Sequence, residues 1–169
     1  MNLVNQFGDS LWRPMTQHAF PPASARKLFV RGDGCHLIDE GGQRHLDALA
    51  GLYCVNIGYG RAEVAAAAGK AMAELAYLAP NMASRGAIEL ADRIAAMVGM
   101  AGQVYFSSSG SEANETAFKI VRQFHAQRDG GARRFKIIAR YRGYHGNTMG
   151  ALSATGQSQR KAIYEPLAP

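Results

Sequence analysis

The stretch SSSGSE at residues 107–112 combines small hydroxyl side chains with a glycine just before an expected helix. The first backbone N–H groups of a helix have no partner inside it, and the helix dipole adds partial positive charge there. Gly110 lets an anion approach the backbone without meeting a Cβ atom, and Ser109 and Ser111 can add hydroxyl donors. These residue types favour binding of a phosphate group at this turn.

A structural role explains the same spacing. Ser109 and Glu112 fit the S-x-x-E capping box, in which the two side chains satisfy backbone N–H groups at the start of a helix. Spacing alone leaves the phosphate site and the plain cap both open. The chain contains no G-x-x-x-x-G-K-[ST] and no G-x-G-x-x-G that follows a strand and opens a helix. The two common nucleotide-binding loops are therefore excluded.

A second turn, GYHGNT at residues 143–148, follows the apolar run FKIIAR at residues 135–140. Ligands of open α/β sheets bind at the carboxyl ends of the strands, and both turns are expected there. Tyr144 offers a flat face for stacking on an aromatic ligand, and Gly146 permits close approach. The alternative is a turn packed on the core, with His145 as a hydrogen-bonded structural histidine rather than a base.

The elements that must position these turns follow from hydrophobic periodicity and turn residues. Residues 27–46 predict a small antiparallel meander, and the loop 51–60 carries Tyr53, Asn56 and Tyr59. The pattern predicts helices over 61–78, from a Ser84 cap to Gly99, and over 112–127, with buried strands at 103–107 and 135–140. This alternation indicates an α/β fold with a mostly parallel sheet. The arm up to Pro22 is expected to lie on another part of the protein.

Composition narrows the class of protein. The 169 residues are 47% hydrophobic and 19% charged, which is ordinary for a globular protein and excludes collagen, coiled coil and wholesale disorder. No leader sequence or membrane span is recognised, so a cytoplasmic protein is expected. Cys35 and Cys54 are predicted to be reduced packing residues, and no metal site is predicted.

The net charge of +6 raises the possibility of nucleic-acid binding. The excess is concentrated in Arg128, Arg133, Arg134, Lys136, Arg140 and Arg142. This region has few aromatic residues and no recognised binding motif, so a solvated basic face is the preferred interpretation and no nucleic-acid partner is predicted.

The motifs SSSGSEANETAFK and YRGYHGNTMGALSATG resemble those of the class III PLP-dependent aminotransferases, of fold type I. The similarity runs from LWRPMTQH to EPLAP, nearly the whole chain. GLYCVNIGYGR and GALSATGQSQRKAIYEPLAP resemble the ω-amino acid:pyruvate transaminases of the taurine and β-alanine type. The resemblance implies an arm, meander and substrate loop over 1–60, and the first part of the large PLP domain over 61–169.

The same resemblance implies roles for individual residues. Ser109, Gly110 and Ser111 would hold the phosphate of pyridoxal 5'-phosphate (PLP), and Tyr144 would stack on its ring with His145 beside it. Tyr53, which stands where similar enzymes usually have Trp, would line the substrate pocket. An amine donor and pyruvate would be the substrates. The full-length protein would be a homodimer, with residues 78–85 near the neighbouring subunit's site.

Transamination requires a lysine that holds the cofactor and moves a proton, and an acid against the pyridine nitrogen. None of the chain's lysines, Lys27, Lys70, Lys119, Lys136 and Lys161, stands in the family's Schiff-base motif. We therefore expect no catalytic residue in this chain, which has the features of an N-terminal fragment that is inactive alone. A non-catalytic module that binds phosphate or PLP is the alternative.

Overall fold

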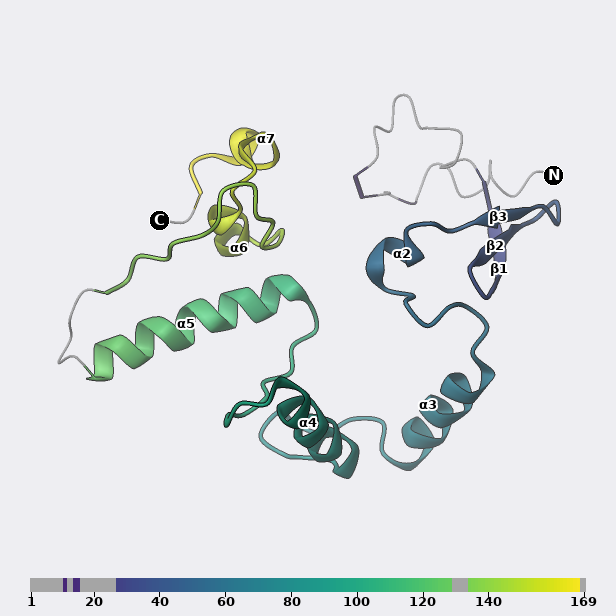
Figure 1. The fold of residues 1–169 in the computed structure, drawn as a ribbon, viewed down its shortest axis with the longest axis horizontal. Helices are drawn as coiled ribbons and strands as arrows, with labels where there is room; N and C mark the ends of the chain where they lie inside the picture. The colour runs from purple at the N-terminus through teal and green to yellow at the C-terminus, as the bar shows by residue number, and fades with distance from the viewer. Residues whose placement is uncertain (1–10, 12–13, 16–26, 129–133, 168–169) are drawn as a thin grey trace. The chain divides into compact units, whose positions relative to one another are not determined.

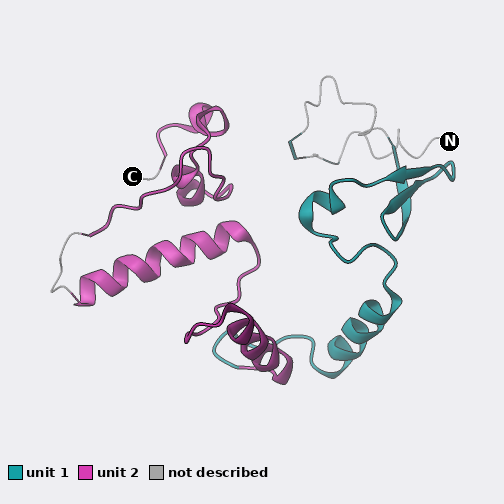
Figure 2. Cartoon of the chain, in the orientation of Figure 1, with its two compact units in different colours: residues 1–82 teal, residues 83–169 magenta. Residues whose placement is uncertain are grey.

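The computed structural model describes residues 11, 14–15, 27–128 and 134–167. The chain divides into two compact units, Met1–Met82 and Ala83–Pro169, which Figure 2 distinguishes by colour. Apart from residues 11, 14 and 15, the predicted N-terminal arm lies outside the described residues. The domain assignment to 1–60 and 61–169 stays a prediction.

Unit 1 contains the antiparallel meander that the sequence predicts. Strands β1 (Phe29–Asp33), β2 (His36–Asp39) and β3 (Arg44–Leu46) form one sheet in the order β1-β2-β3 (Figure 1). The Asp39 carboxylate accepts the backbone N–H groups of Gly41 at 3.1 Å and Gln43 at 2.9 Å, which closes the turn between β2 and β3. A short polar side chain that binds its own turn in this way stabilises a tight connection.

The loop after the sheet is tied back to it. It contains the four-residue element α2 (Ala50–Tyr53), all of whose residues have positive φ, so the predicted loop 51–60 begins with a tight left-handed turn. Tyr59 exchanges two backbone hydrogen bonds with Gly34, of 3.2 and 2.7 Å, and its hydroxyl donates to Asp47 at 2.7 Å. These bonds fix the far end of the loop on the sheet.

Two helices follow, α3 (Ala62–Glu74) and α4 (Arg85–Val98). The predicted first helix ends at Glu74 rather than at residue 78, because Leu75 is extended and half exposed. No side chain of α3 is buried, so no packed apolar face extends the helix beyond Glu74. The predicted boundaries of α4 are confirmed. Ser84 accepts the N–H of Ala87 at 3.2 Å, and Gly99 ends the helix in the left-handed conformation at φ 68°.

Unit 2 is built around the long helix α5 (Gly110–Arg128), followed by α6 (Met149–Ala154), α7 (Ser158–Lys161) and the 3-10 turn η2 (Ala162–Tyr164). The predicted third helix is confirmed and begins two residues earlier than predicted, at Gly110 rather than Glu112. Ala151, Leu152 and Thr155 are buried at and just beyond α6. The small core of this unit therefore lies directly beside the turn 143–148.

The prediction of two buried strands is wrong. Residues 103–107 and 135–140 pair with no strand in the described part of the chain. Tyr105 is 69% exposed and Ile138 is 97% exposed. Their apolar patterns suit a buried strand, but a parallel strand also needs neighbours that are distant in sequence. The described residues supply only an isolated parallel bridge between Tyr141 and Gly156.

The prediction for the cysteines is confirmed for their free thiols and wrong for their burial. Cys35 and Cys54 are free thiols, as expected, but both are exposed rather than packed in a core. They lie on the surface because the segments that carry them are short turns at the edge of the small sheet and after α2.

The end of α4 allows a controlled test of backbone strain. Gly99 has positive φ and Gly102 does not, while a Cβ atom built on either glycine meets no atom within 4 Å. We expect Gly99→Ala to lower the free energy of unfolding by about 1 kcal/mol, because the left-handed conformation disfavours a Cβ atom. Gly102→Ala, the matched control, is expected to leave it unchanged. Urea denaturation followed by circular dichroism measures both, and equal effects of the two substitutions would contradict the strain argument.

Candidate functional site

The start of α5 is capped by its own side chains. Ser109 Oγ accepts the N–H of Glu112 at 3.2 Å, and Glu112 Oε2 accepts the N–H of Ser108 at 2.8 Å. The predicted reciprocal cap is therefore present, with Glu112 binding the N–H of Ser108 rather than that of Ser109. The structural interpretation of the serine turn is confirmed.

The cap leaves donors for an anion. The backbone N–H groups of Gly110 and Ser111 donate no hydrogen bond to any atom in the described ranges. A Cβ atom built on Gly110 meets nothing within 4 Å, so the space next to the backbone is open. Two free N–H groups at the positive end of a 19-residue helix are suited to a phosphate group. Capping and phosphate binding are thus compatible at this turn.

The turn 143–148 lies directly against the first turns of α5. The N–H of Asn147 donates to Ser111 Oγ at 2.9 Å, and Asn114 Nδ2 donates to the carbonyl of His145 at 2.6 Å. Glu115 Oε1 accepts the Thr148 hydroxyl at 2.6 Å and the N–H of Ala151 at 3.0 Å. The structure therefore brings the two motifs together.

Three side chains of α5 make these bonds, and only Ser111 among them is predicted from the sequence. Ser111, Asn114 and Glu115 are spaced i, i+3 and i+4, so they share one face of the helix. Asn114 and Glu115 were missed. The sequence does contain a signal for them, because both are polar and lie three and four residues after Ser111. A row of polar side chains on the helix face that starts at a candidate site indicates a face able to contact a second turn.

Gly146 is required at this contact. It is buried with φ 139°, and a Cβ atom there would lie 2.8 Å from the Cβ of Ala151 and 2.9 Å from the Cα of Ser111. The sequence pattern predicts that this glycine admits a ligand. The structure shows that α5 and α6 themselves occupy the space.

Tyr144 and His145 differ in their surroundings. Tyr144 is 50% exposed, and the guanidinium carbon of Arg160 lies 5.3 Å from its ring centroid. The N–H of His145 donates to the buried hydroxyl of Thr155 at 3.1 Å, whereas its ring Nδ1 is buried without a hydrogen-bond partner in the described residues. His145 is thus hydrogen-bonded through its backbone, and its ring Nδ1 remains unpaired.

The carboxylate of Glu115 is ionised at neutral pH. The hydrogen bond from Thr148 lowers the pKa of Glu115, and the N–H groups of Ala151 and Gly150 and the charge of Lys119 lower it further, against a smaller opposing effect of burial. The group is therefore a pure hydrogen-bond acceptor at neutral pH.

Tyr53, the predicted substrate-pocket residue, lies in unit 1 on α2 and is 74% exposed. The loop around it is held by Asp47, whose carboxylate accepts the Tyr59 hydroxyl and the N–H of Gly51. The Tyr59 bond lowers the pKa of Asp47, and the same bond raises the pKa of Tyr59. The contact of Tyr53 with substrate stays a prediction.

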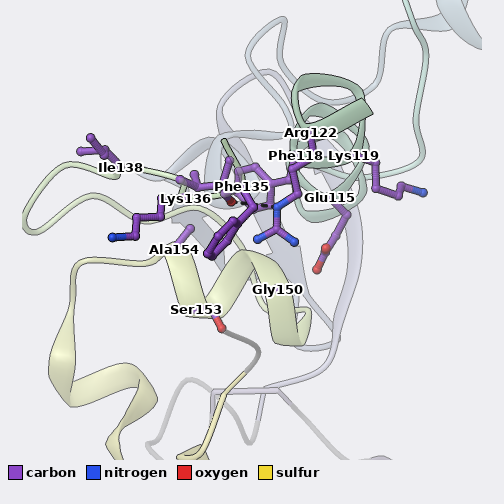
Figure 3. Close-up of a pocket in the computed structure, with 11 residues that line it drawn as sticks. Glu115, Phe118, Lys119, Arg122, Phe135, Lys136, Ile138, Gly150, Ser153 and Ala154 are labelled. Atoms are coloured by element: carbon purple, nitrogen blue, oxygen red, sulfur yellow. Dashed lines mark hydrogen bonds between the residues drawn. The ribbon is translucent and has the colours of Figure 1, made fainter. Parts of the chain in front are cut away.

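A separate cavity of about 480 Å³ lies between α5, α6 and residues 135–138 (Figure 3). Its apolar lining includes Phe118 and Phe135, and Arg122 Nε donates to the carbonyl of Phe135 at 2.9 Å. The serine turn does not line it. The cavity shares only Glu115 and Gly150 with the contact between α5 and α6, so it is distinct from the serine turn.

Two further findings concern the described residues. They contain no group of three or more His, Cys, Asp or Glu side chains placed to hold a metal ion. They also contain no helix with the length and apolar character to cross a membrane.

The contact at Gly146 generates a test of how the two turns are held together. Gly146→Ala would force Ser111 and Ala151 apart, and we expect the free energy of unfolding to fall by about 2 kcal/mol, as in other overpacked sites. Gly110→Ala is the matched control, since its Cβ atom meets open space. Urea denaturation compares them. A Gly146→Ala chain as stable as the control would show that the turns are not in contact.

The chain matches known proteins over most of its length. Residues 21–169 match the family model of class III aminotransferases. Aminotransferase YhxA of Bacillus subtilis (strain 168) is 54% identical over 137 residues, which are 81% of this chain and 30% of that protein. Taurine–pyruvate aminotransferase of Bilophila wadsworthia is 42% identical over 161 residues, 94% of this chain and 34% of that protein.

A solved structure supports the same relationship. The crystal structure of a Bacillus anthracis aminotransferase is 43% identical, with a TM-score of 0.90, and the match covers 98% of this chain and 36% of that one. The chain thus spans about a third of the length of the relatives that it matches. Its fold is part of the fold of the PLP-dependent aminotransferases, and the chain belongs to the class III aminotransferase family.

Proposed function

We propose that this chain provides the phosphate-binding turn and the ring-facing wall of a PLP site. The complete reaction is proposed for a protein of the length of its relatives, in which an amino group moves from an ω-amino acid or amine to pyruvate. Family membership supports amino transfer, and the similarity to a taurine–pyruvate aminotransferase supports these substrates. One observation carries the assignment to this site: the hydrogen bond from the N–H of Asn147 to Ser111 Oγ, which joins the two motifs.

The residues present fit the phosphate of PLP. The N–H groups of Gly110 and Ser111 are without acceptors among the described residues, and a Cβ atom at Gly110 would extend into open space. Ser109 Oγ and Ser111 Oγ each accept one backbone N–H, so the hydroxyl proton of each remains able to donate. A phosphate dianion would receive these donors together with the partial positive charge of α5.

The ring of PLP would meet the second turn. Tyr144 is half exposed and can stack on a flat ligand, and His145 shapes the same turn through its bonds to Asn114 and Thr155. When bound, PLP supplies an electron sink for bond cleavage at the amino-bearing carbon of the substrate. The residues of this chain bind and orient that group and move no proton themselves.

The lysines support the proposal that the chain alone is inactive. Lys27 lies 3.3 Å from His45 Nε2, Lys70 lies 3.9 Å from Glu74, and Lys161 donates to the carbonyl of Ser153 at 3.3 Å. Lys119 and Lys136 line the separate cavity. None of these ammonium groups has a contact with the serine turn or Tyr144 among the described residues. The homodimer proposed for the longer protein rests on the family resemblance alone, and its cytoplasmic location stays a prediction from the sequence.

Binding of PLP to the 169-residue chain tests the proposal. We expect Gly110→Asp to abolish binding in equilibrium dialysis, because its carboxylate would be placed beside the free N–H groups and repel phosphate. Gly102→Asp, on an open position outside the motifs, is expected to bind normally. Unchanged binding by Gly110→Asp would contradict the assigned turn.

The same protein samples test whether the 169-residue chain is inactive in transamination. We expect no alanine from taurine and pyruvate, and no PLP adduct after borohydride treatment in mass spectrometry. An adduct on Lys119 or Lys136 would show that the chain carries its own cofactor lysine.

A further inference from the structure

Glu115 holds the second turn from a rigid position. Its carboxylate oxygen Oε1 accepts both the Thr148 hydroxyl at 2.6 Å and the N–H of Ala151 at 3.0 Å, and the nearby N–H of Gly150 helps to lower the pKa of Glu115. A Cβ atom on Gly150 would lie 2.5 Å from Oε2, so the backbone of α6 rests on the carboxylate itself. These contacts join the first turn of α6 to the second turn of α5.

The contacts of Glu115 favour a carboxylate over an amide. Two donors, the Thr148 hydroxyl and the N–H of Ala151, converge on Oε1, and Oε2 lies against the backbone of Gly150. A glutamine has one acceptor oxygen, so its NH₂ group would stand either in place of Oε2 beside the N–H of Gly150 or in place of Oε1 opposite Thr148 and Ala151. A donor facing a donor leaves both without a partner, which costs more than a lost hydrogen bond.

Glu115 lies close in sequence to the serine turn and contacts the segment that follows the turn with Tyr144. Ser111 is one helical turn before it on the same face of α5, and Tyr144 precedes Thr148 by one short turn. Thr148 and Ala151 are held by Glu115, and Thr155, just after α6, accepts the N–H of His145. The turn that carries Tyr144 is therefore held by contacts at the start of α6 and by a contact just after its end.

We propose that Glu115 is a positioning residue of the PLP site, which sets the distance between the phosphate-binding N–H groups and the ring of Tyr144. Glu115 contacts neither the phosphate-binding N–H groups nor the tyrosine ring. The inference rests on the proposed function for the identity of the ligand. It assigns to Asn114 a supporting role, since Asn114 binds the carbonyl of His145 on the same helix face.

Two ligands separate positioning from folding. Inorganic phosphate needs only the serine turn, whereas PLP needs the serine turn and the tyrosine wall at the correct separation. We expect Glu115→Gln to weaken binding of PLP about tenfold, the size expected for losing a hydrogen bond to a charged group, and to change phosphate affinity less than twofold. Glu89→Gln, an exposed carboxylate on α4, is the matched control and is expected to change neither affinity.

Each outcome decides the inference. Unchanged PLP affinity in Glu115→Gln, or an equal loss for both ligands, would overturn it. If Glu115→Gln does not fold by circular dichroism, Thr148→Val carries the test with a smaller loss in the same direction. A wild-type chain that binds phosphate but not PLP would contradict the proposed function alone. Hydrogen exchange at the N–H of Asn147 then decides on Glu115, because positioning predicts faster exchange in Glu115→Gln and a bystander predicts no change.

Discussion

The contact between one face of α5 and the turn 143–148 is the interaction on which the candidate site depends. Ser111, Asn114 and Glu115 bind the backbone or hydroxyl groups of that turn and of the start of α6. Each bond joins residues more than 30 positions apart, so the contact brings together two segments that are distant in the sequence. Without it, no hydrogen bond among the described residues would join the serine turn to the turn that carries Tyr144.

The first turns of α5 have two separate roles because of the geometry of a helix. Its first N–H groups remain available to an anion, and the adjoining face is used for docking the second turn. Because the helix is rigid over one or two turns, the docking bonds fix Tyr144 relative to the free N–H groups. A protein needs such preorganised support around a binding site, since loops alone hold side chains less accurately.

Local chemistry made much of the chain predictable. The meander, the Ser84 and Gly99 boundaries of α4 and the cap of α5 depend on residues within a few positions of each other, and their signals are in the sequence. Both turns of the candidate site were found from residue types. Asn114 and Glu115 were not, because their partners are about 30 residues away and no local pattern identifies them.

The failed predictions have a common physical cause. Residues 103–107 and 135–140 have the apolar pattern of buried strands, yet strands are made by neighbours that a local pattern does not contain. Leu75 likewise has the residue type for a helix face without a surface to pack on. Cys35 and Cys54 are exposed for the same reason, since burial depends on what covers a segment.

The central claim is that the two turns form one binding site, and a titration of the 169-residue chain with PLP followed by NMR tests it most directly. The account predicts that the amide signals of Gly110 and Ser111 and the ring signals of Tyr144 shift together, with one dissociation constant. Shifts confined to one of the two turns, or two different dissociation constants, would contradict it.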